Sequence, residues 1–507
     1  MLRFGADGNH IIGGGSAGCV MANRLSADSD KAVCLIEAGP RDRNPFIHMP
    51  LGVGVIARTG WVNWNCETEV EPHLNNRRLY WPRGKTLGGS SSINAMVYIR
   101  GDRADYEGWG AAAGADWDWP RMRELFIALE NNQAIHDEHH GNAGPLCVSN
   151  LGRVNPLTED FVEAGVELHY PRNPDFNGVS QEGFGVYQVT QKDGQRFSTA
   201  RAFLDPARSR KNLAIETNGL VERILFKDRR AIGVRVGGRD LLLRPGGEVI
   251  LSAGAVNSPQ ILMLSGVGPS HHLRSLGIPV VHESPGVGQN LRDHPNIRVP
   301  LEVKDDFPMD PKAPRSQTAL RYTAEGSTLR NDMQLMASSF SSPISGDPLE
   351  AEGIRFTCIL ELANGAGEVT LASTDPNDQP NLSYHFLEDP FDLQRLREAV
   401  RLCVRFQDHE EYRNIVKRRI TPTDEALATD ETLDAWLRRN VSTSQHLAGT
   451  CKMGPSSDET AVVDQYCRVH GLQGLRVVDT SVMPNVVRAN TNATAIMIAE
   501  RVAEWMK

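Results

Sequence analysis

The sequence predicts an α/β protein (α+β overall) that combines a parallel, dinucleotide-binding sheet with a second domain built on another sheet. Three observations support this prediction: a glycine-rich turn near the start of the chain, short strand-like runs in its middle, and a buried-strand pattern near its end. The turn covers residues 13–18, with the sequence GGGSAG, between apolar runs at residues 9–12 and 33–37. An apolar run, a glycine turn, a helix-like stretch and a second apolar run describe one βαβ unit.

Each glycine of this turn has its own physical task. Gly13 permits the tight turn, Gly15 lets a pyrophosphate approach the backbone, and Gly18 permits close packing of the helix on the strand. The helix N-terminus then offers unpaired N–H groups and a partial positive charge to the phosphates. Glu37, which ends the second run, is placed to accept hydrogen bonds from a ribose. The pattern predicts a dinucleotide site of either the NAD or the FAD type, and a purely structural turn is the alternative.

The remaining strands and helices of this first part follow from local patterns. Residues 9–12 include His10 where a buried parallel strand is normally apolar, so we expect them to be the least regular part of the sheet. Short β-rich runs between turn residues predict strands at residues 213–215, 221–226, 232–236 and 249–251. A helix is predicted over residues 258–264, with Pro259 in its first turn, where a missing N–H costs nothing.

The second half of the chain changes character and then returns to the first pattern. Residues from about 297 to 443 contain strands, polar loops and the amphipathic stretch Leu393 to Phe406, which predict a second domain built on a sheet. Residues 475–479 again form a buried-strand pattern that ends in an acid, followed by a helix over residues 493–505. The dinucleotide fold is therefore expected to be completed by the far end of the chain.

Composition excludes several classes of protein. The 507 residues exceed one ordinary core, and a net charge of −9 gives no basic surface for a nucleic acid. No apolar run approaches the ~20 residues that span a bilayer, and no secretory signal is visible, although a removed one would leave no trace. The eight cysteines are scattered without a Cys-x-x-Cys pair, which predicts reduced thiols and a cytoplasmic location.

A loop of unusual composition follows the first βαβ unit. Residues 82–94, with the sequence PRGKTLGGSSSIN, concentrate glycine and serine and so offer many backbone N–H groups and small hydroxyls. Such a loop can wrap a phosphate or the polar edge of a flat ring, or it can be a flexible surface loop. The apolar Ile93, Ala95, Met96 and Val97 favour a buried loop.

Two histidine-containing segments suggest chemistry. His446 precedes a small-residue turn, and Asn490 follows about 44 residues later; in one cleft, the pair could hold an alcohol oxygen and remove its proton. A lone histidine is more often structural, so this pair is a hypothesis at this point. Residues 136–140, with the sequence HDEHH, resemble a metal cluster, but their polar surroundings predict a solvated loop and no metal site.

Four segments in order carry a family resemblance. The loop from Gly84 to Asn94 and the segment Gly254 to Pro259 resemble the two signatures of the glucose–methanol–choline (GMC) oxidoreductases. His446, ahead of Gly-Thr-Cys-Lys-Met-Gly, matches the active-site histidine of that family, and Asn490 matches its second catalytic position. Residues 477–484 resemble its closing flavin-binding strand. The resemblance covers nearly the whole chain.

The resemblance implies a Rossmann-like FAD-binding domain at 1–155, 200–296 and 456–507, and a discontinuous second domain with an antiparallel sheet for substrate at 156–199 and 297–455. It also implies FAD contacts: Gly13, Gly15, Ser16, Ala17, Gly18 and Glu37 for the ADP half, Val221 near adenine, Asn94, Ala95 and Val97 along the flavin, Asp479, Thr491 and Asn492 over the ribityl chain and ring, and Ala38, Gly84, Gly88, Ser92 and Ala253 as further contacts. Where some members bind FAD covalently through a histidine, this chain has Ile93, so non-covalent FAD is expected.

The implied reaction is oxidation of a primary alcohol to the aldehyde. His446 would accept the hydroxyl proton, Asn490 would orient the oxygen, and a hydride would pass to flavin N5, with O₂ or a quinone-type carrier as final acceptor. The stretch from Arg321 to Leu335 resembles members that act on aromatic, furanic or pyridoxine-like alcohols, whereas Gln445 and Leu447 depart from the family pattern and leave the substrate open. The alternatives are a choline or aliphatic alcohol dehydrogenase, a lyase with structural FAD, an NAD-dependent dehydrogenase and a binding protein without turnover. The chain is expected to be a monomer or a homodimer.

Overall fold

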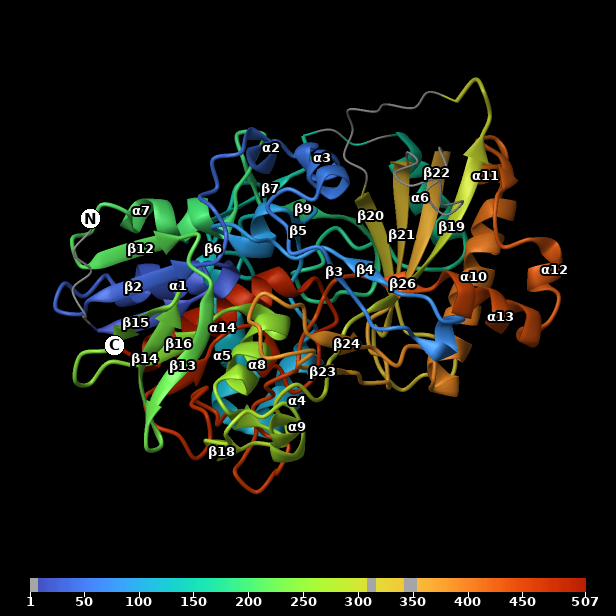
Figure 1. Cartoon of the computed structure of the whole chain (residues 1–507). Helices are drawn as coiled ribbons and strands as arrows, with labels where there is room; N and C mark the ends of the chain where they lie inside the picture. Colours follow the sequence, from blue (N-terminus) through green and yellow to red (C-terminus); the bar gives the residue numbers. More distant parts are fainter. Residues whose placement is uncertain (1–7, 153, 155, 308–315, 342–352) are drawn as a thin grey trace.

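Two large β-sheets, one parallel and one antiparallel, occupy opposite sides of the molecule (Figure 1). The computed structural model describes residues 8–152, 154, 156–307, 316–341 and 353–507. The first described strand and the last helix, β1 (Asn9–Ile12) and α14 (Thr491–Trp505), both lie on the side of the parallel sheet, where blue, green and red segments meet, so this half is built from distant parts of the chain. The α/β class with a second, antiparallel sheet is therefore confirmed.

The parallel sheet is assembled from five short strands. In spatial order these are β12 (Leu213–Thr217), β2 (Val33–Glu37), β1 (Asn9–Ile12), β16 (Val249–Leu251) and β27 (Leu475–Val477). Every neighbouring pair is parallel. Since β27 lies more than 450 residues after β1 and pairs with β16 beside it, the prediction that the far end of the chain completes this sheet is confirmed.

Strand β1 is regular, and the expectation that it would be the least regular part of the sheet was wrong. It pairs with β2 on one side and β16 on the other, without a register shift. His10 is buried between these strands, and burial lowers its pKa to about 4. The imidazole is therefore neutral at pH 7 and packs in the sheet as a small aromatic ring.

Two of the helices on this sheet matter most for the site. Helices α1 (Ser16–Leu25) and α14 (Thr491–Trp505) pack against each other. Helix α8 (Gly254–Leu264) begins four residues before its predicted start, so Pro259 lies inside it and not in its first turn. The carbonyl of Ala255, which Pro259 cannot bond, accepts a hydrogen bond of 2.6 Å from the Thr450 hydroxyl.

The antiparallel sheet forms the other half. Its strands in order are β25 (Val416–Arg419), β19 (Pro295–Val303), β22 (Gly353–Leu360), β21 (Met333–Ser341), β20 (Ser316–Tyr322) and β8 (Gly183–Val186), with β26 (Ser442–Thr443) paired to β19. Helices α10 (Pro390–Asp408) and α6 (Pro156–Glu167) cover one face. Helix α10 contains the predicted amphipathic stretch. The opposite face looks toward the parallel sheet.

Shorter elements complete the chain. The other strands are β3 (Cys66–Glu67), β4 (Tyr80–Trp81), β5 (Val97–Tyr98), β6 (Glu130–Asn132), β7 (Leu146–Asn150), β9 (Gln188–Val189), β10 (Gln191–Lys192), β11 (Gln195–Arg196), β13 (Val221–Lys227), β14 (Arg230–Val236), β15 (Arg239–Leu242), β17 (Val267–Gly268), β18 (His282–Glu283), β23 (Glu368–Thr370) and β24 (Asn381–Ser383). The other helices are α2 (Pro45–His48), α3 (Gly52–Thr59), α4 (Arg103–Ala113), α5 (Trp119–Leu129), α7 (Asp205–Ala207), α9 (Ser270–Ser275), α11 (Glu410–Arg413), α12 (Asp424–Leu427) and α13 (Asp430–Asn440). The predicted strands at residues 213–215, 221–226, 232–236 and 249–251 are all present.

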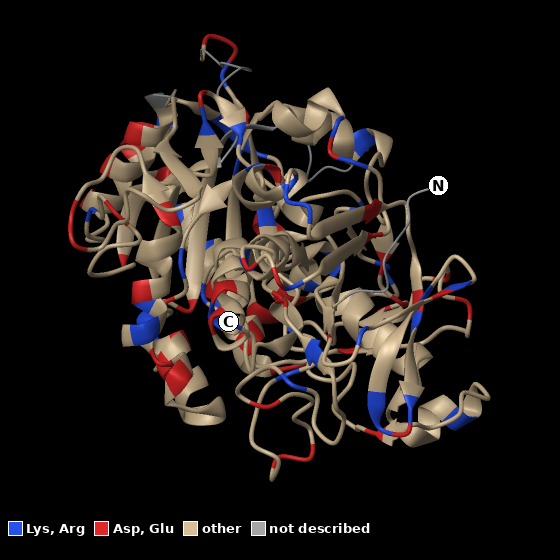
Figure 2. Ribbon diagram, turned by 90° about the vertical axis from the view of Figure 1, so that its left-hand side faces the viewer, with Lys and Arg blue, Asp and Glu red and all other residues tan. Residues whose placement is uncertain are grey.

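The distribution of charges and the state of the cysteines agree with the expectations drawn from the composition. Basic and acidic residues are interspersed over the ribbon in the view of Figure 2. In the part of the chain that the structure describes, no helix combines the length and the apolar character needed to cross a membrane. All eight cysteines are free thiols, and seven of them are buried.

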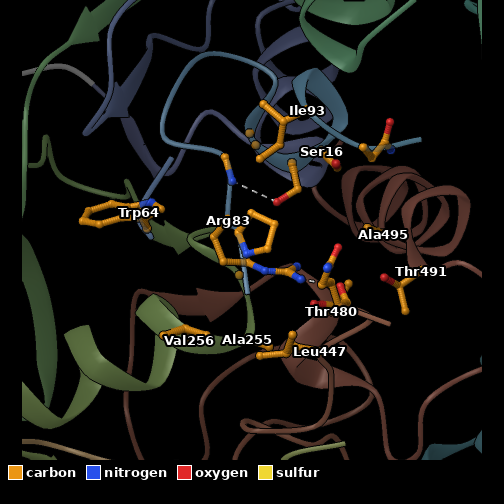
Figure 3. A pocket seen from close by; sticks show the side chains of 18 of the residues that line it. Ser16, Trp64, Arg83, Ile93, Ala255, Val256, Leu447, Thr480, Thr491 and Ala495 are labelled. Atoms are coloured by element: carbon orange, nitrogen blue, oxygen red, sulfur yellow. Dashed lines mark hydrogen bonds between the residues drawn. The ribbon is translucent and has the colours of Figure 1, made fainter. Parts of the chain in front are cut away.

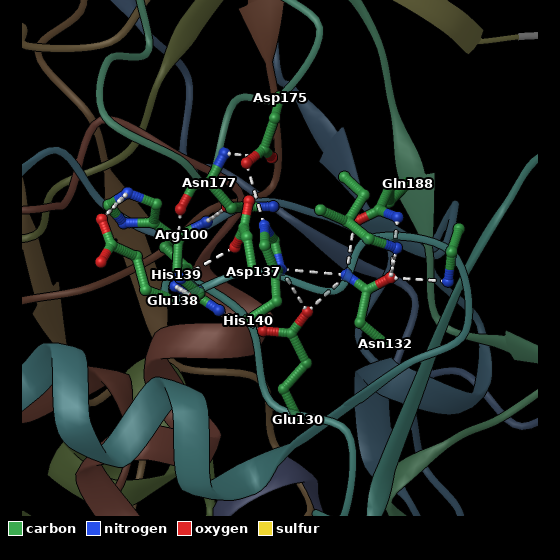
Figure 4. Close-up of polar contacts among 12 residues, drawn as sticks. Arg100, Glu130, Asn132, Asp137, Glu138, His139, His140, Asp175, Asn177 and Gln188 are labelled. Atoms are coloured by element: carbon green, nitrogen blue, oxygen red, sulfur yellow. Dashed lines mark hydrogen bonds and ion pairs between the residues drawn. The ribbon is translucent and has the colours of Figure 1, made fainter.

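His140 lies at the centre of a buried ion-pair network, so the interpretation of residues 136–140 as a wholly solvated loop was wrong for this histidine (Figure 4). Its Nδ1 is 2.8 Å from Glu130 Oε1 and its Nε2 is 2.9 Å from Asp175 Oδ2, while Arg100 pairs with Glu130 from the other side. Hydrogen bonds to the two carboxylates raise the pKa of His140 to about 9, against the opposing effect of burial. Although Asp137 and Asp175 lie within 4.8 Å of a His140 nitrogen, both ring nitrogens are engaged as donors, which leaves no lone pair for a metal.

Replacing His140 by asparagine is expected to destabilise the protein by about 3–5 kcal/mol at pH 6, because it removes one partner of a buried ion pair. The folded-state pKa lies above the unfolded value of 6.5, so this stabilisation is complete below pH 6.5 and is lost as the pH rises through 9. Urea unfolding of wild type and His140→Asn at pH 6 and pH 10 measures the difference, with the exposed His271→Asn as control. A difference that is equal at both pH values would contradict an imidazolium at position 140.

Candidate active site

A cavity of about 420 Å³ lies between the two sheets. At one end it is lined by residues that follow the carboxyl ends of the parallel strands: Gly13 after β1, Ala38 after β2, Ser252 after β16 and Asp479 after β27. At the other end it meets the open face of the antiparallel sheet. Ligands of open parallel sheets bind at such carboxyl ends. Figure 3 shows the cavity with Ser16, Ile93 and Thr491 around it.

The glycine turn adopts the geometry predicted from its spacing. Gly13 has a φ of +97°, which an L side chain rarely adopts. A Cβ on Gly18 would lie 1.9 Å from the Gly13 carbonyl oxygen, so only glycine lets α1 pack this closely. Gly15 lines the cavity and would meet nothing nearer than 3.9 Å. It is also the N-cap of α1, without a side-chain cap, so the first N–H groups of the helix stay available to a ligand.

Glu37 reinforces this turn. Its two carboxylate oxygens accept hydrogen bonds from the backbone N–H groups of Gly14 and Gly39, each at 2.8 Å. Burial raises the pKa of Glu37 to about 7. The side chain also lines the cavity, and each carboxylate oxygen retains a lone pair that can accept a hydrogen bond from a ligand hydroxyl.

The glycine- and serine-rich loop is buried, as its apolar neighbours predicted. Its hydroxyls, however, bind the protein itself: Ser91 Oγ donates to the Gly88 carbonyl at 2.6 Å, and Ser92 Oγ donates to the Leu87 carbonyl at 2.8 Å. Gly88 has a φ of +85°, and a Cβ there would lie 2.3 Å from Ser92 Oγ. The structure therefore places Gly88 and Ser92 behind the cavity wall, where they shape the loop instead of facing a ligand.

Most of the other predicted cofactor residues face the cavity. Those that line it are Gly13, Gly15, Ser16, Ala17, Glu37, Ala38, Gly84, Asn94, Ala95, Val97, Val221, Ala253, Asp479, Thr491 and Asn492. Gly18 lies behind Gly13, in agreement with its packing task.

The start of α14 adds a second helix N-terminus to the cavity. Its N-cap, Asn490, makes no side-chain cap hydrogen bond, and Ser16 Oγ of α1 donates to Asn492 Oδ1 at 2.8 Å, which ties the two helix starts together. Ser252 Oγ also lines the cavity and is buried without a hydrogen-bond partner. Two uncapped helix ends, an open glycine backbone and an orphaned hydroxyl fit an elongated, phosphate-bearing dinucleotide.

His446 and Asn490 meet in this cavity. The Asn490 amide nitrogen lies 2.9 Å from His446 Nε2, and His446 Nδ1 lies 2.8 Å from Nδ1 of His294. Burial, with a further contribution from His294, lowers the pKa of His446 to about 3. The imidazole is therefore neutral at pH 7. In the tautomer that fits these contacts, Nδ1–H donates to His294 and the Nε2 lone pair faces the cavity.

Asp293 holds the backbone around this histidine. Its carboxylate accepts the backbone N–H groups of His446 and His294, each at 2.7 Å, and the Tyr384 hydroxyl at 2.7 Å. Gln445, the residue before His446, has a left-handed φ of +66°. Its carbonyl accepts a hydrogen bond from Arg83, which also lines the cavity. The strained turn is thus fixed from both sides.

Sequence reasoning missed the groups behind His446. Glu361 Oε2 lies 3.2 Å from His294 Nδ1, and Arg321 pairs with Glu361 Oε1 at 3.1 Å; all three side chains are buried. Burial raises the pKa of Glu361, and Arg321 opposes that shift. In the sequence, the adjacent polar residues Asp293 and His294, just before β19, are the one feature that could have drawn attention to this region. No motif or spacing links them to His446. The proposed link between residues 321–335 and an aromatic substrate finds no support, because Arg321, Tyr322 and Leu335 are buried away from the cavity lining.

Comparison with known proteins decides the family. The family model described as GMC oxidoreductase matches residues 9–296 with its N-terminal part and residues 363–499 with its C-terminal part. The chain belongs to the GMC oxidoreductase family. As a GMC oxidoreductase it is an FAD-dependent enzyme, and the family resemblance inferred from its motifs is confirmed.

Relatives of this GMC oxidoreductase include an alcohol dehydrogenase [acceptor] of Pseudomonas putida, 44% identical over 97% of this chain and 94% of the relative. An oxygen-dependent choline dehydrogenase of Paraburkholderia xenovorans is 39% identical over 98% of this chain and 93% of the relative. Among solved structures, pyridoxine 4-oxidase from Mesorbium loti superposes with a TM-score of 0.90 at 29% identity, covering 98% of this chain and 99% of that one.

Proposed function

We propose that this GMC oxidoreductase oxidises a primary alcohol to the aldehyde. The observation that carries the proposal is the neutral His446 imidazole, whose Nε2 faces Asn490 in the same cavity as the two uncapped helix N-termini. The relatives named for alcohol and choline oxidation support it. Electrons would leave to O₂ or a quinone-type carrier.

We propose that FAD is bound without a covalent link. The ADP half would lie along Gly15, Ser16 and Glu37, and the flavin between Asn94 and Thr491. Ile93, whose side chain cannot be alkylated by a flavin, stands at the position where some members carry the attaching histidine, and the described lining residues contain no cysteine and no histidine besides His446. Acid precipitation of the holoenzyme should release all of the yellow colour into the supernatant; colour retained in the pellet would contradict non-covalent binding.

His446 would act as the general base. A substrate hydroxyl that enters between His446 Nε2 and the Asn490 amide replaces their mutual hydrogen bond and gains a bond to each. Nε2 takes the hydroxyl proton, while the amide, which does not titrate, keeps the oxygen oriented. FAD, when bound, supplies the two-electron acceptor for the hydride of the carbinol carbon. The Asp293 contacts keep the imidazole in place during this transfer.

His294 would position His446 and share its proton. The two Nδ1 atoms lie 2.8 Å apart, so only one of them can carry a proton. If His294 Nδ1 accepts this hydrogen bond, His446 carries its proton on Nδ1 and its Nε2 has a free lone pair. After Nε2 has taken the alcohol proton, the Nδ1 proton of His446 can move to His294. Burial lowers the pKa of His294 to about 4 against the opposing charge of Asp293, and Glu361 Oε2 lies 3.2 Å from its Nδ1.

Replacing His294 by leucine should lower the rate of flavin reduction by about 10–100-fold, because His446 loses the acceptor that sets its tautomer. His294 also lowers the pKa of His446, so its removal raises that pKa and moves the acid limb of the rate–pH profile to higher pH. His294→Gln, which can still accept from Nδ1, should recover most of the rate. Stopped-flow reduction from about pH 2.5, reached by rapid pH jump, to pH 9 measures both effects, because the acid limb of the wild type is expected near pH 3. A lower rate with an unmoved acid limb would indicate a merely structural role.

The substrate end of the cavity favours a neutral alcohol over choline. Antiparallel strands contribute Asn296, Arg298, Met336, Ser338, Arg355, Thr357 and Ile359 to it. Among the described lining residues the only carboxylates are Glu37 and Asp479, both bonded to backbone N–H groups at the dinucleotide end. Apart from the His446 imidazole, the only aromatic ring among the described lining residues is that of Trp64, over which the Lys85 ammonium lies at 4.1 Å. A quaternary ammonium group is usually recognised by a carboxylate or an open aromatic face, and the described wall offers neither.

Anaerobic reduction with a panel of benzylic, furanic, aliphatic and choline substrates tests this proposal. We expect kcat/KM for the best neutral alcohol to exceed that for choline by at least 100-fold. Aromatic, furanic and pyridoxine-like alcohols are the first candidates within the neutral class. Choline as the preferred substrate would contradict the proposal, and reoxidation of the reduced enzyme in air would separate an oxidase from a dehydrogenase.

We further propose the domain division implied by the family resemblance. Residues 1–155, 200–296 and 456–507 would form the FAD-binding unit, and residues 156–199 and 297–455 the substrate unit; position 155 itself lies outside the described residues. The placement of β8 in the antiparallel sheet and of β27 in the parallel sheet supports it. A cytoplasmic location is likewise proposed, on the ground that all eight cysteines are free thiols.

A further inference from the structure

The segment from residue 41 to residue 61 presents an unusual surface. It contains helices α2 and α3, which lie side by side at the upper edge of the molecule in Figure 1. Met49, Leu51 and Trp61 are each about half exposed, at 50%, 46% and 50%. They are three of the nine exposed large apolar side chains among the described residues, yet they fall within 13 positions of one another. Clustered exposed apolar side chains mark an interaction surface, whereas single ones do not.

Basic side chains accompany these apolar ones. Arg41, Arg43 and Arg58 are exposed and form no ion pair in the part of the chain that the structure describes. The only acid of the segment, Asp42, is buried and paired with Arg208 at 3.0 Å. A local charge of about +3 on a chain of net charge −9 gives this surface a sign opposite to that of the whole molecule.

The inner side of the same segment contacts the wall of the cavity. Ile47 of α2 and Ile56 of α3 form a small apolar cluster with Ile93, separate from the main core. Ile93 lines the cavity, as does Trp64, three residues after Trp61. The exposed face of α2 and α3 thus lies one helix layer from the cavity, on the outer side of its wall.

We infer that the surface formed by Arg41, Arg43, Met49, Leu51, Arg58 and Trp61 docks on an anionic lipid bilayer. Apolar side chains insert at the level of the headgroups while arginines bind lipid phosphates, the combination typical of proteins that lie on a membrane without crossing it. A second copy of the chain fits less well, because a twofold contact through this face would oppose the same three arginines across the interface. Docking would bring the cavity close to lipid-soluble alcohols and electron carriers.

Sedimentation with vesicles tests the inference on the holoenzyme. We expect binding to vesicles of phosphatidylglycerol and phosphatidylcholine, at least tenfold weaker binding to phosphatidylcholine alone, and release by 0.5 M salt. The double variant Leu51→Ser/Trp61→Ser and the triple variant Arg41→Gln/Arg43→Gln/Arg58→Gln should each lose at least tenfold in bound fraction. Leu242→Ser, which changes a 48% exposed leucine on β15, a strand at the left of Figure 1 and away from α2 and α3, is the matched control and should bind like wild type.

Two outcomes would overturn the inference. One is equal binding of wild type and both patch variants, or binding of none of them, while FAD content and circular dichroism show that all are folded. The other is a concentration-dependent dimer in sedimentation velocity that Leu51→Ser/Trp61→Ser abolishes, which would assign the surface to a second copy. Vesicle binding is measured without substrate, so failure of the proposed alcohol oxidation would leave this test intact.

Discussion

Replacing His446 by alanine is expected to lower the rate of flavin reduction by alcohol about 10²–10⁴-fold while FAD stays bound. Alanine removes the imidazole whose Nε2 would accept the hydroxyl proton beside Asn490. The carboxylates among the described lining residues, Glu37 and Asp479, are bonded to backbone N–H groups elsewhere and cannot replace it. The turn that carries position 446 is held through backbone contacts to Asp293, so the cavity should keep its shape. Anaerobic stopped-flow reduction measures the rate, and the protein-to-flavin absorbance ratio measures FAD content.

The control for this experiment is His271→Ala, which removes an exposed histidine on α9. Added imidazole should restore part of the rate in His446→Ala and leave the control unchanged. A reduction rate within threefold of wild type would remove His446 from the mechanism. Loss of FAD would instead show that the side chain holds the cofactor.

The second large effect is expected at the opposite end of the cavity. Gly18→Ala places a Cβ 1.9 Å from the Gly13 carbonyl oxygen and 3.1 Å from its carbon, so α1 must move away from β1. Because the N-terminus of α1 is proposed to bind the phosphates, FAD content should fall below about a tenth of wild type, with a loss of stability of about 1–3 kcal/mol. Absorbance of the purified protein and thermal unfolding with and without added FAD measure the two effects.

Gly108→Ala is the matched control, since it also changes a helical glycine but its Cβ would meet nothing within 4 Å. This variant should keep its FAD and gain stability, because alanine favours a helix over glycine by about 0.5–1 kcal/mol. Full FAD occupancy in Gly18→Ala would contradict the assignment of the glycine turn to the cofactor.

The features that could be predicted from the sequence were those that depend on residues close together in the chain. The glycine turn was predicted from the spacing of its glycines alone, and the structure confirms the positive φ at Gly13 and the close packing at Gly18. The start of α8 was misplaced because Pro259 is tolerated only through Thr450, 195 residues away from the carbonyl it rescues. His10 was misjudged because its charge depends on burial, which sequence does not display.

In the candidate site, too, the local features were predicted and the long-range contacts were not. Short motifs predicted that His446 and Asn490 act as a pair, and the structure places the Asn490 amide nitrogen 2.9 Å from His446 Nε2. His294 and Glu361 were missed because they reach His446 only through the fold, across 152 residues in the case of His294. Gly88 and Ser92 were assigned to the ligand, yet they shape the loop from behind, since a serine hydroxyl bonds a nearby carbonyl as readily as a phosphate.

Anaerobic mixing of the holoenzyme with a neutral primary alcohol tests the central claim most directly. If the chain oxidises alcohols through FAD in this cavity, the visible absorbance of oxidised flavin should bleach, with one equivalent of aldehyde formed per FAD. Deuterium on the carbinol carbon should slow the bleaching. A flavin that stays oxidised with every alcohol tested, in a fully loaded enzyme, would contradict the account and leave FAD with a structural role.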